Sequence, residues 1–505
     1  MSVYINNSNK SYTEKGSLQY SSTEQDCLDL FSRIGSMRNT SHIKVLEMFK
    51  SAYDQNPKLA TQILFWARSA RIGAGERAVF RTILKELHSS SPAFIIDNAI
   101  NIAELGYWKD LLHYFDLEKI VDIYAEAILA KDRLACKWAP RKGPNAIKLR
   151  NACKFTNKQY RVWLRENSVT VEQQMTNKQW SDINYSSVPG QAMRTYKGAF
   201  NNRDKTRFDL WKADDSKASV SASYPHNVTQ LLLNGESYDT ILDADVALAE
   251  KQWKNLPDYI SPGENILPII DVSGSMCGLP MLVAISLGLY VSERCKSTFK
   301  NRYLTFSSNP QWGIVDEEDD LDVKFKKILK ADWGMSTDFE RAYRLILDSA
   351  LQFNVPQEAM PTMLLCLSDM QFDSARSGRL HLEEMQAEFK LAGYDMPKLV
   401  FWNLDSRDTS GSPATKDSTD VGLVSGFSPA LMKAVLACED FNPLDVMYEA
   451  LKPIKVDYTN LPTQFRHNGH ALKHFADGFH EGRWEDDMPI QLEDWQEKLE
   501  ALQHT

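Results

Sequence analysis

The stretch IIDVSGSM at residues 269–276 decides the fold of the second half of the chain. An apolar, β-branched run ends abruptly in Asp-x-Ser-x-Ser. In extended backbone, residues at i, i+2 and i+4 share one side, so Asp271, Ser273 and Ser275 can direct a carboxylate and two hydroxyls to one point. Gly274 keeps this turn unobstructed. The pattern therefore predicts a buried strand whose end carries hard oxygen ligands.

Strands and helices alternate from residue 264 onward. The segments ENILPIID, RYLTFSS, TMLLCLSD, PKLVFWNL and VGLVSGFS are apolar and typical of buried strands, and amphipathic helical patterns lie between them. Apolar strands that alternate with such helices predict a doubly wound parallel sheet over residues 264–455.

Two further oxygen ligands are expected at the same edge of this sheet. Thr337 lies in the loop DWGMSTDF before a predicted helix, and Asp369 ends the strand TMLLCLSD. Ligands bind beyond the carboxyl ends of the strands in open α/β sheets. Oxygen donors of this kind suit Mg²⁺ or Mn²⁺. The predicted metal site comprises Asp271, Ser273, Ser275, Thr337 and Asp369.

Each of these residues has a simpler interpretation when it is taken alone. DVSGS fits a plain strand-to-helix turn in which the serines cap a helix. Thr337 and Glu340 fit a capping box, and Asp369 fits a cap of the segment that follows it. The metal hypothesis depends on all five residues occurring at strand-to-helix junctions.

The first half of the chain is helical by pattern. Apolar residues recur at three- and four-residue spacing from about residue 41, and the breaks at Asn56-Pro57 and Ser91-Pro92 lie 35 residues apart. This spacing predicts a HEAT-like solenoid of stacked helix pairs over residues 41–262. Residues 1–40 are expected to be a polar, irregular segment, and residues 456–505 an acidic tail.

Composition excludes several classes of protein. The chain has 505 residues, 43% of them hydrophobic and 25% charged. It lacks an apolar run of 18 residues and an apolar signal-peptide core, so we expect no membrane association. Seven scattered cysteines without a Cys-x-x-Cys pair fit reduced thiols in the cytoplasm. His467, His470 and His474 lack the thiolates or carboxylates that would complete a zinc site.

A basic segment contrasts with the net charge of −9. Residues 131–211 hold 17 Lys and Arg against 6 Asp and Glu. Basic side chains neutralise phosphates, and exposed aromatic side chains stack on single-stranded bases. The alternative is that the aromatic residues are core and the charges a solvated face. The aromatic candidates are Trp138, Phe155, Tyr160 and Trp163. The candidate RNA-binding residues are Lys137, Arg141, Lys142, Lys148, Arg150, Lys154, Lys158, Arg161 and Arg165.

The second half resembles a von Willebrand factor A domain. Asp271-Val-Ser273-Gly-Ser275, Thr337 and Asp369 match that family's metal-ion-dependent adhesion site. The resemblance implies one divalent cation with an open position that an acidic group of a partner fills. It implies binding and not catalysis. We expect no enzyme, because no nucleophile–base pair lies nearby and a lone Mg²⁺ without a second carboxylate cluster is a poor hydrolase site.

The helical half contains two stretches that resemble the Ro (TROVE) family. They are ARSARIGAGERAVFRTIL (67–84) and ELGYWKDLLHYF (104–115), and FWNL (401–404) with VGLVSGFSPALMKAVL (421–436) resembles a microbial, viral and plant branch of Ro-like proteins. This resemblance implies a ribonucleoprotein in which a helical ring binds small structured or single-stranded RNA. It does not imply DNA binding. The alternative for GAGER is a helix–helix turn with close backbone approach and a Glu76–Arg77 ion pair.

Two functions follow as expectations. The first is a non-catalytic, Ro-like RNA-binding scaffold or RNA surveillance factor whose A domain binds a divalent cation and a partner. The second is a Mg²⁺-dependent protein-interaction module that binds no RNA.

Overall fold

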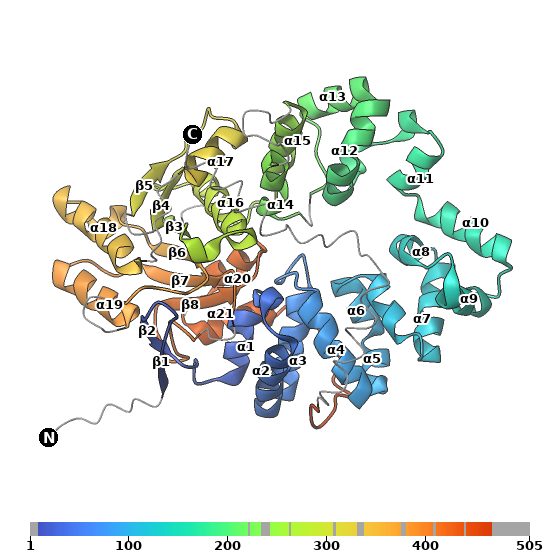
Figure 1. The fold of residues 1–505 in the computed structure, drawn as a ribbon, viewed down its shortest axis with the longest axis horizontal. Helices are drawn as coiled ribbons and strands as arrows, with labels where there is room; N and C mark the ends of the chain where they lie inside the picture. Colours follow the sequence, from blue (N-terminus) through green and yellow to red (C-terminus); the bar gives the residue numbers. More distant parts are fainter. Residues whose placement is uncertain are drawn as a thin grey trace.

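The computed structural model describes residues 9–466 apart from 221–222, 234–242, 262–263, 307–309, 331–337, 375–379, 408–410 and 439–440. A helical part is followed by an α/β part (Figure 1). The predicted class, α-helical repeats followed by an α/β domain, is therefore confirmed. Thr337, the three histidines at 467, 470 and 474, and the acidic tail beyond residue 466 lie outside the described residues.

The α/β part is built on one sheet in the order β5-β4-β3-β6-β7-β8. Its strands are β3 (Ile266–Asp271), β4 (Arg302–Phe306), β5 (Gln311–Ile314), β6 (Met363–Ser368), β7 (Lys398–Asn403) and β8 (Val421–Ser425). All neighbouring pairs are parallel except β4 and β5. The prediction of a purely parallel sheet is wrong at this edge, because β5 is short and largely exposed and has no apolar run to reveal it.

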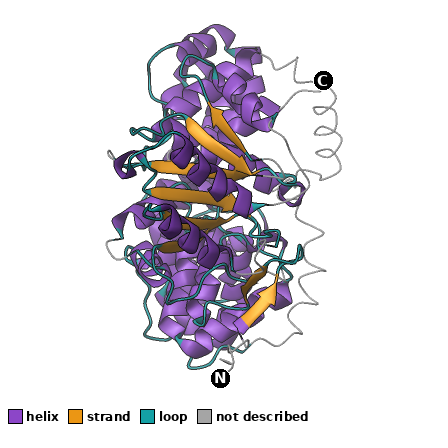
Figure 2. Cartoon of the chain, turned by 90° about the vertical axis from the view of Figure 1, so that its left-hand side faces the viewer, coloured by secondary structure: helices purple, strands orange, loops and turns teal. Residues whose placement is uncertain are grey.

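Both faces of the sheet are covered by helices (Figure 2). Successive residues of β3 alternate between two cores: Ile266 and Ile270 join one, and Leu267 and Ile269 join the other. The first core continues into the helical part of the chain. The helices of the α/β part are α16 (Leu279–Arg294), α17 (Leu321–Leu329), α18 (Phe339–Gln352), α19 (His381–Ala392), α20 (Leu431–Ala437) and α21 (Pro443–Leu451).

Helices of the helical part begin where the sequence supplies caps. At each of the two predicted breaks a polar residue caps a helix that starts with proline: Asn56 accepts from the N–H of Leu59, and Ser91 accepts from the N–H of Phe94. The helices are α2 (His42–Gln55), α3 (Pro57–Arg68), α4 (Ala78–Ser90), α5 (Pro92–Asp97), α6 (Ala99–Leu105), α7 (Glu118–Leu129), α8 (Arg133–Trp138), α9 (Gly143–Ala152), α10 (Asn157–Ser168), α11 (Val171–Thr176), α12 (Gly190–Arg203), α13 (Lys205–Ala213), α14 (Pro225–Thr229) and α15 (Asp243–Lys254).

Residues 1–40 are not an irregular segment where the structure describes them. They form strands β1 (Lys10–Tyr12) and β2 (Leu18–Tyr20), which pair as a hairpin, and helix α1 (Asp26–Ile34). Nearly every residue of α1 is buried. Helix α1 packs on the neighbouring α2 and α3 and also on β8 and α21. Sequence reasoning missed it because the residues before it are polar.

The helical part forms an arc whose two ends pack on the α/β part (Figure 1). At one end α1 contacts β8 and α21, and α21 also contacts α3. At the other end α14 contacts α16, and α15 contacts α17. The ring is therefore closed through the α/β part and not by the helices alone.

The GAGER turn, residues 73–77, lies where these parts meet. Gly75 has φ +74°, and a Cβ there would lie 2.0 Å from the hydroxyl of Tyr224, just before α14. A Cβ on Gly426 of the α/β part would lie 2.8 Å from that of Ala74. Glu76 accepts from Arg38 at 2.7 Å and from the first N–H groups of α4. The close backbone approach expected of a helix–helix turn is confirmed, and Arg38 is a partner of Glu76 that the sequence did not indicate.

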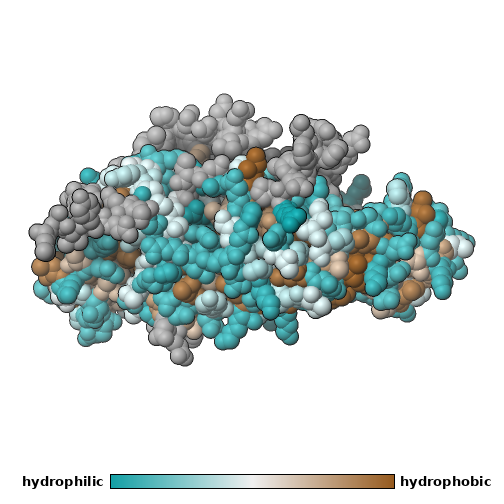
Figure 3. Space-filling view, turned by 90° about the horizontal axis from the view of Figure 1, so that it is seen from below, coloured by the Kyte–Doolittle hydropathy of each residue, from teal (hydrophilic) through white to brown (hydrophobic). Residues whose placement is uncertain are grey.

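The face of the molecule shown in Figure 3 is mostly hydrophilic, with its hydrophobic residues in small separate areas. Single exposed apolar side chains of this kind are normal on protein surfaces. Among the described helices, none combines the length and the apolar character needed to cross a membrane.

A substitution at Gly35 tests how closely helix α1 of the helical part packs against β8. The N–H of Gly35 donates to Ser425 Oγ at 3.0 Å, and a Cβ there would lie 2.4 Å from the carbonyl oxygen of Ser425. We predict that Gly35→Ala lowers the free energy of unfolding by about 1–3 kcal/mol, because backbone must move to admit the methyl group. The measurement is urea denaturation followed by circular dichroism.

Gly198, inside α12, provides the matched control. A Cβ there meets nothing within 4 Å. Gly198→Ala should leave stability unchanged or raise it by up to about 1 kcal/mol, because alanine is the better helix former. Equal effects of the two substitutions would contradict the described docking.

Candidate functional site

Asp271 stands at the point where β3 ends, and its side chain is fully buried. Its Oδ1 accepts from the N–H of Ser273 at 2.9 Å, which fixes the turn after the strand. Its Oδ2 accepts from Ser368 Oγ at 2.6 Å. Ser368 closes β6, the strand that pairs in parallel with β3. The carboxylate is thus held between two neighbouring strand ends, where α/β sheets bind their ligands.

The two serines of the motif connect Asp271 to the second carboxylate. Ser273 Oγ and Ser275 Oγ are 3.0 Å apart. Ser273 also hydrogen-bonds to Asp271, and Ser275 hydrogen-bonds to Asp369. Asp271, Ser273, Ser275 and Asp369 therefore form one hydrogen-bonded chain of oxygen groups, and their binding of a cation stays a prediction.

The structure also bears on the simpler interpretation of these residues as caps of helices and turns. Ser273 stands at the N-cap of a short 3-10 turn, Gly274–Met276, but its side chain makes no capping bond, and the N-cap of α16 is Gly278. Helix α18 is capped by Asp338, which accepts from the N–H of Arg341 at 2.9 Å, and the capping box predicted for Thr337 lies outside the described residues. Asp369 does stabilise a local turn, since its Oδ1 accepts from the N–H of Gln371 at 3.1 Å.

The two carboxylates are electrostatically strained. Burial, and after it the charge of Asp369, raise the pKa of Asp271 to about 7. Burial also raises the pKa of Asp369, although hydrogen bonds and the charges of Arg407 and Lys15 partly offset the rise. Within the described residues Asp271 forms no ion pair. A cation between the two carboxylates would remove this strain.

The donor set fits a hard divalent cation. Two carboxylates and two hydroxyls suit Mg²⁺ or Mn²⁺, which also retain water ligands. In the described part of the chain, no cluster of three or more His, Cys, Asp or Glu could hold a metal ion. This agrees with a site that depends on hydroxyls as well as carboxylates. Asp271, Ser273, Ser275 and Asp369 would hold the cation, and Thr337 remains a predicted ligand.

Arg407 is a neighbour of this site that sequence reasoning missed. It lies in the loop after β7, and its guanidinium donates to Ser275 O at 3.0 Å and to Asp369 Oδ2 at 3.3 Å. The sequence feature that could have indicated Arg407 is its position in FWNLDSRD, just after the carboxyl end of a predicted strand. A charged residue in such a loop is too common to be singled out without the fold.

The predicted basic residues lie mostly at the surface. Lys158, Arg161 and Arg165 are exposed on one face of α10, at spacings of three and four residues. Arg141, Lys142, Lys148 and Lys154 are also exposed, and Lys137 and Arg150 are half-buried. Another face of α10 buries Tyr160 and Leu164. The helix therefore presents a basic stripe, defined here as Lys158, Arg161 and Arg165.

The aromatic residues of the basic segment are mainly core. Tyr160 is buried and donates to Pro140 O at 3.2 Å. Phe155 and Trp163 pack on each other with ring centroids 5.3 Å apart, and Trp163 Nε1 donates to Ile128 O at 2.9 Å. Burial does not support the stacking role of Tyr160, whereas Phe155 and Trp163 are half-buried, with Lys131 over the Trp163 ring, and their stacking role stays a prediction.

Trp138 belongs to a different arrangement. Its ring lies 5.7 Å from that of Tyr107, which is 36% exposed. Cationic side chains lie over both rings: Arg77 over Tyr107, and Lys109 and Lys137 over Trp138. Helix α8, which carries Trp138, packs against α10. This aromatic pair was missed because residues 107 and 138 meet only in the fold.

Comparisons with known proteins divide the chain close to the boundary between the helical part and the α/β part. Residues 265–460 match the model of a domain of unknown function, DUF7788, and residues 13–120 and 119–262 match that of another, DUF2828. An uncharacterized protein, L728, of Acanthamoeba polyphaga mimivirus is 28% identical over 512 residues, which cover 88% of each chain.

One solved structure resembles the chain loosely. The crystal structure of the Deinococcus radiodurans RO (RSR) protein matches 85% of this chain and 93% of its own, at 14% identity and a TM-score of 0.35. None of these matches assigns a function to the chain.

The pKa of Asp271 predicts how the cation affects stability. A carboxyl whose pKa is raised on folding stabilises the folded chain below its unfolded pKa, near 4, and this contribution is lost as the pH rises through about 7. In chelator, the melting temperature should therefore fall between about pH 5 and about pH 8. Mg²⁺ should raise it more at the higher pH, where it binds the ionised carboxylates without proton competition.

Two variants isolate this effect in thermal denaturation. Asp271→Asn should weaken the pH dependence of the Mg²⁺ response, because the amide neither titrates nor carries charge and Asp369 is then the remaining carboxyl with a raised pKa. Asp417→Asn should behave as wild type, because Asp417 is exposed and pairs with Lys416. A Mg²⁺ response that is equal at both pH values in the wild type would contradict the described site.

Proposed function

We propose that the chain is a non-catalytic binding protein whose α/β part captures an acidic group of a partner through a divalent cation. The observation that carries this proposal is the buried pair Asp271 and Asp369, joined through two serine hydroxyls at the ends of β3 and β6. The resemblance of these residues to an adhesion site of the von Willebrand A type supports it.

The chemistry of the site favours binding over catalysis. The cation would supply a positive charge that accepts an oxygen ligand from outside the chain. The protein residues around it hold the carboxylates in place: Ser368 and the N–H of Ser273 fix Asp271, and the N–H of Gln371 fixes Asp369. Such a rigid, pre-organised ligand set provides affinity and orientation for a partner's carboxylate.

Capture of proteins by the immobilised full chain tests this proposal. In Mg²⁺, a set of proteins from the native cells should be retained and then released by EDTA. We predict that Asp271→Ala abolishes this retention, because the buried ligand that anchors the cation is lost. Asp417→Ala, an exposed substitution of the same kind, should retain the set. Retention that survives both EDTA and Asp271→Ala would refute the proposal.

A second candidate function is RNA binding by the helical arc. The basic stripe on α10 and the pair Tyr107–Trp138, with its overlying cations, favour it. Phosphates would contact the stripe, and an unpaired base could stack at the aromatic pair. The resemblance of residues 67–84 and 104–115 to Ro proteins supports the same function, and Tyr107 lies in the second of these stretches.

Charge reversal on the stripe tests RNA binding. Arg161→Glu with Arg165→Glu should lower the affinity for a mixed-sequence single-stranded RNA at least about tenfold. It should also reduce the slope of the logarithm of the binding constant against the logarithm of the salt concentration by about 1–2. Fluorescence anisotropy at several salt concentrations measures both effects. Asp271→Ala should leave them unchanged.

The matched control reverses two exposed charges elsewhere. Lys44→Glu with Lys50→Glu, on α2, changes the net charge by the same amount. If the control pair weakens RNA binding as much as the α10 pair, binding follows net charge and the stripe is not the RNA surface.

A further inference from the structure

Arg407 makes contacts that join the metal-site residues to the N-terminus of the chain. One nitrogen, Nη2, donates to both Ser275 O and Asp369 Oδ2. The other terminal nitrogen, Nη1, donates to Glu14 Oε2 at 3.2 Å. A guanidinium stays protonated and has a fixed planar fork, so it can hold two carboxylates at once.

Glu14 lies in the turn of the β1–β2 hairpin, and this turn is anchored beside Asp369. The N–H of Glu14 donates to Gln371 Oε1 at 3.1 Å, and Thr13 Oγ1 donates to Phe372 O at 2.8 Å. Gly16 forms an isolated bridge with Asp373. The hairpin turn thus lies along residues 371–373, directly after the predicted ligand Asp369.

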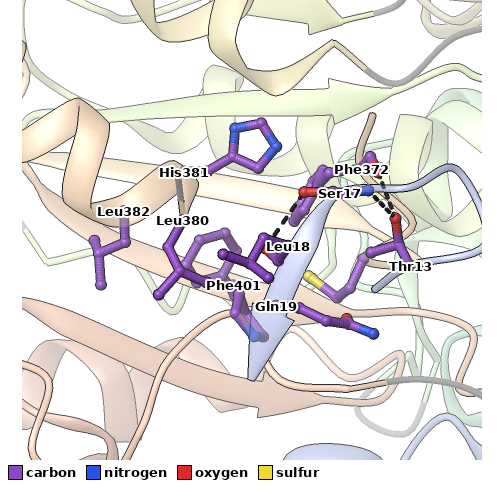
Figure 4. A pocket seen from close by; sticks show the side chains of 11 residues that line it. Thr13, Ser17, Leu18, Gln19, Phe372, Leu380, His381, Leu382 and Phe401 are labelled. Atoms are coloured by element: carbon purple, nitrogen blue, oxygen red, sulfur yellow. Dashed lines mark hydrogen bonds between the residues drawn. The ribbon is translucent and has the colours of Figure 1, made fainter. Parts of the chain in front are cut away.

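The strand β2 fixes the rest of the hairpin to the same surface. Figure 4 shows Leu18 close to Phe372 and Phe401, with Thr13 hydrogen-bonded to Phe372. The backbone of Tyr20 exchanges two hydrogen bonds with Ser412, at 2.9 and 2.8 Å. Residues on both sides of the hairpin therefore belong to the α/β part, and Glu14 is held beside Arg407 by the fold.

Both oxygens of Asp369 are already engaged in this arrangement. Oδ1 accepts from the N–H of Gln371, and Oδ2 accepts from Arg407. A divalent cation that takes Oδ2 would meet the guanidinium at the same atom, and the two positive charges repel each other. Cation binding and the Arg407–Asp369 contact therefore oppose each other.

We propose that Arg407 is a built-in counter-ion that competes with the divalent cation for Asp369, and that Glu14 weakens this competition by drawing Arg407 toward the hairpin. The inference rests on the proposed cation site and describes how that site is regulated. It makes the N-terminal hairpin part of the metal centre through one side chain.

Titration calorimetry with Mg²⁺ on the full chain tests the proposal. Arg407→Gln should bind Mg²⁺ about five- to tenfold more tightly than wild type, because the competing charge-assisted hydrogen bond is gone. Glu14→Gln should bind more weakly, because Arg407 then keeps its ion pairs with Asp369 and Asp405 and loses the one that draws it toward the hairpin. In the double variant the effect of Glu14→Gln should vanish, because Glu14 acts through Arg407.

Lys416→Gln is the matched control. It removes one positive charge from the same region of the chain, but its ammonium pairs with Asp417 at 2.7 Å. Its Mg²⁺ affinity should equal that of wild type. Far-ultraviolet circular dichroism of every variant verifies that the fold is kept.

The outcomes separate this inference from the proposed function. If wild type binds Mg²⁺ and Arg407→Gln binds it no more tightly, the competition is refuted while the cation site stands. If Glu14→Gln still weakens binding in the Arg407→Gln background, the role given to Glu14 is refuted. If neither wild type nor Arg407→Gln binds Mg²⁺, the cation site itself fails, and the inference with it.

Discussion

Two carboxylates, Asp271 and Asp369, are buried at the ends of neighbouring parallel strands, and the groups around them must compensate for their charge. Burying one ionised carboxylate is unfavourable, and placing a second beside it is more so. The chain meets this with a set of donors: Ser368 and the N–H of Ser273 for Asp271, the N–H of Gln371 for Asp369, and two serine hydroxyls between them. A cation bound between the two carboxylates would compensate for the remaining unfavourable charge.

The helical arc is built around the α/β part that holds these carboxylates. Its first helices pack on β8 and α21, and its last pack on α16 and α17, so the ring closes through the sheet domain. Helix α10, which carries the basic stripe, lies on the far side of the arc from the sheet (Figure 1). The two proposed binding surfaces can therefore be engaged at the same time, as a scaffold requires.

Sequence reasoning succeeded where one local rule was sufficient. The two-residue period of extended backbone predicts that the side chains of Asp271, Ser273 and Ser275 point to the same side. The rule that ligands gather at strand ends predicts the position of Asp369. The five apolar strands and the proline-started helices after Asn56 and Ser91 were also readable, because their burial or capping is local.

It failed where the deciding contact lies far away in sequence. The docking of helix α1 on the sheet near residue 425 is one such contact, and Tyr107 meets Trp138 across thirty-one positions. Arg407 and Glu14 are nearly 400 residues apart, and nothing in either local sequence indicates the other. Tyr160 shows the opposite error: an aromatic residue among basic ones suggested stacking, but the helix turns it into the core.

The most direct test of the central claim is to locate the cation. Crystals grown with Mn²⁺ and measured near its absorption edge would show its position by anomalous scattering. The account predicts one strong peak within about 2–2.5 Å of Ser273 Oγ and Ser275 Oγ, next to Asp271 and Asp369. A structure with full occupancy of Mn²⁺ elsewhere, or with Arg407 on Asp369 and no peak between the carboxylates at saturating Mn²⁺, would contradict it.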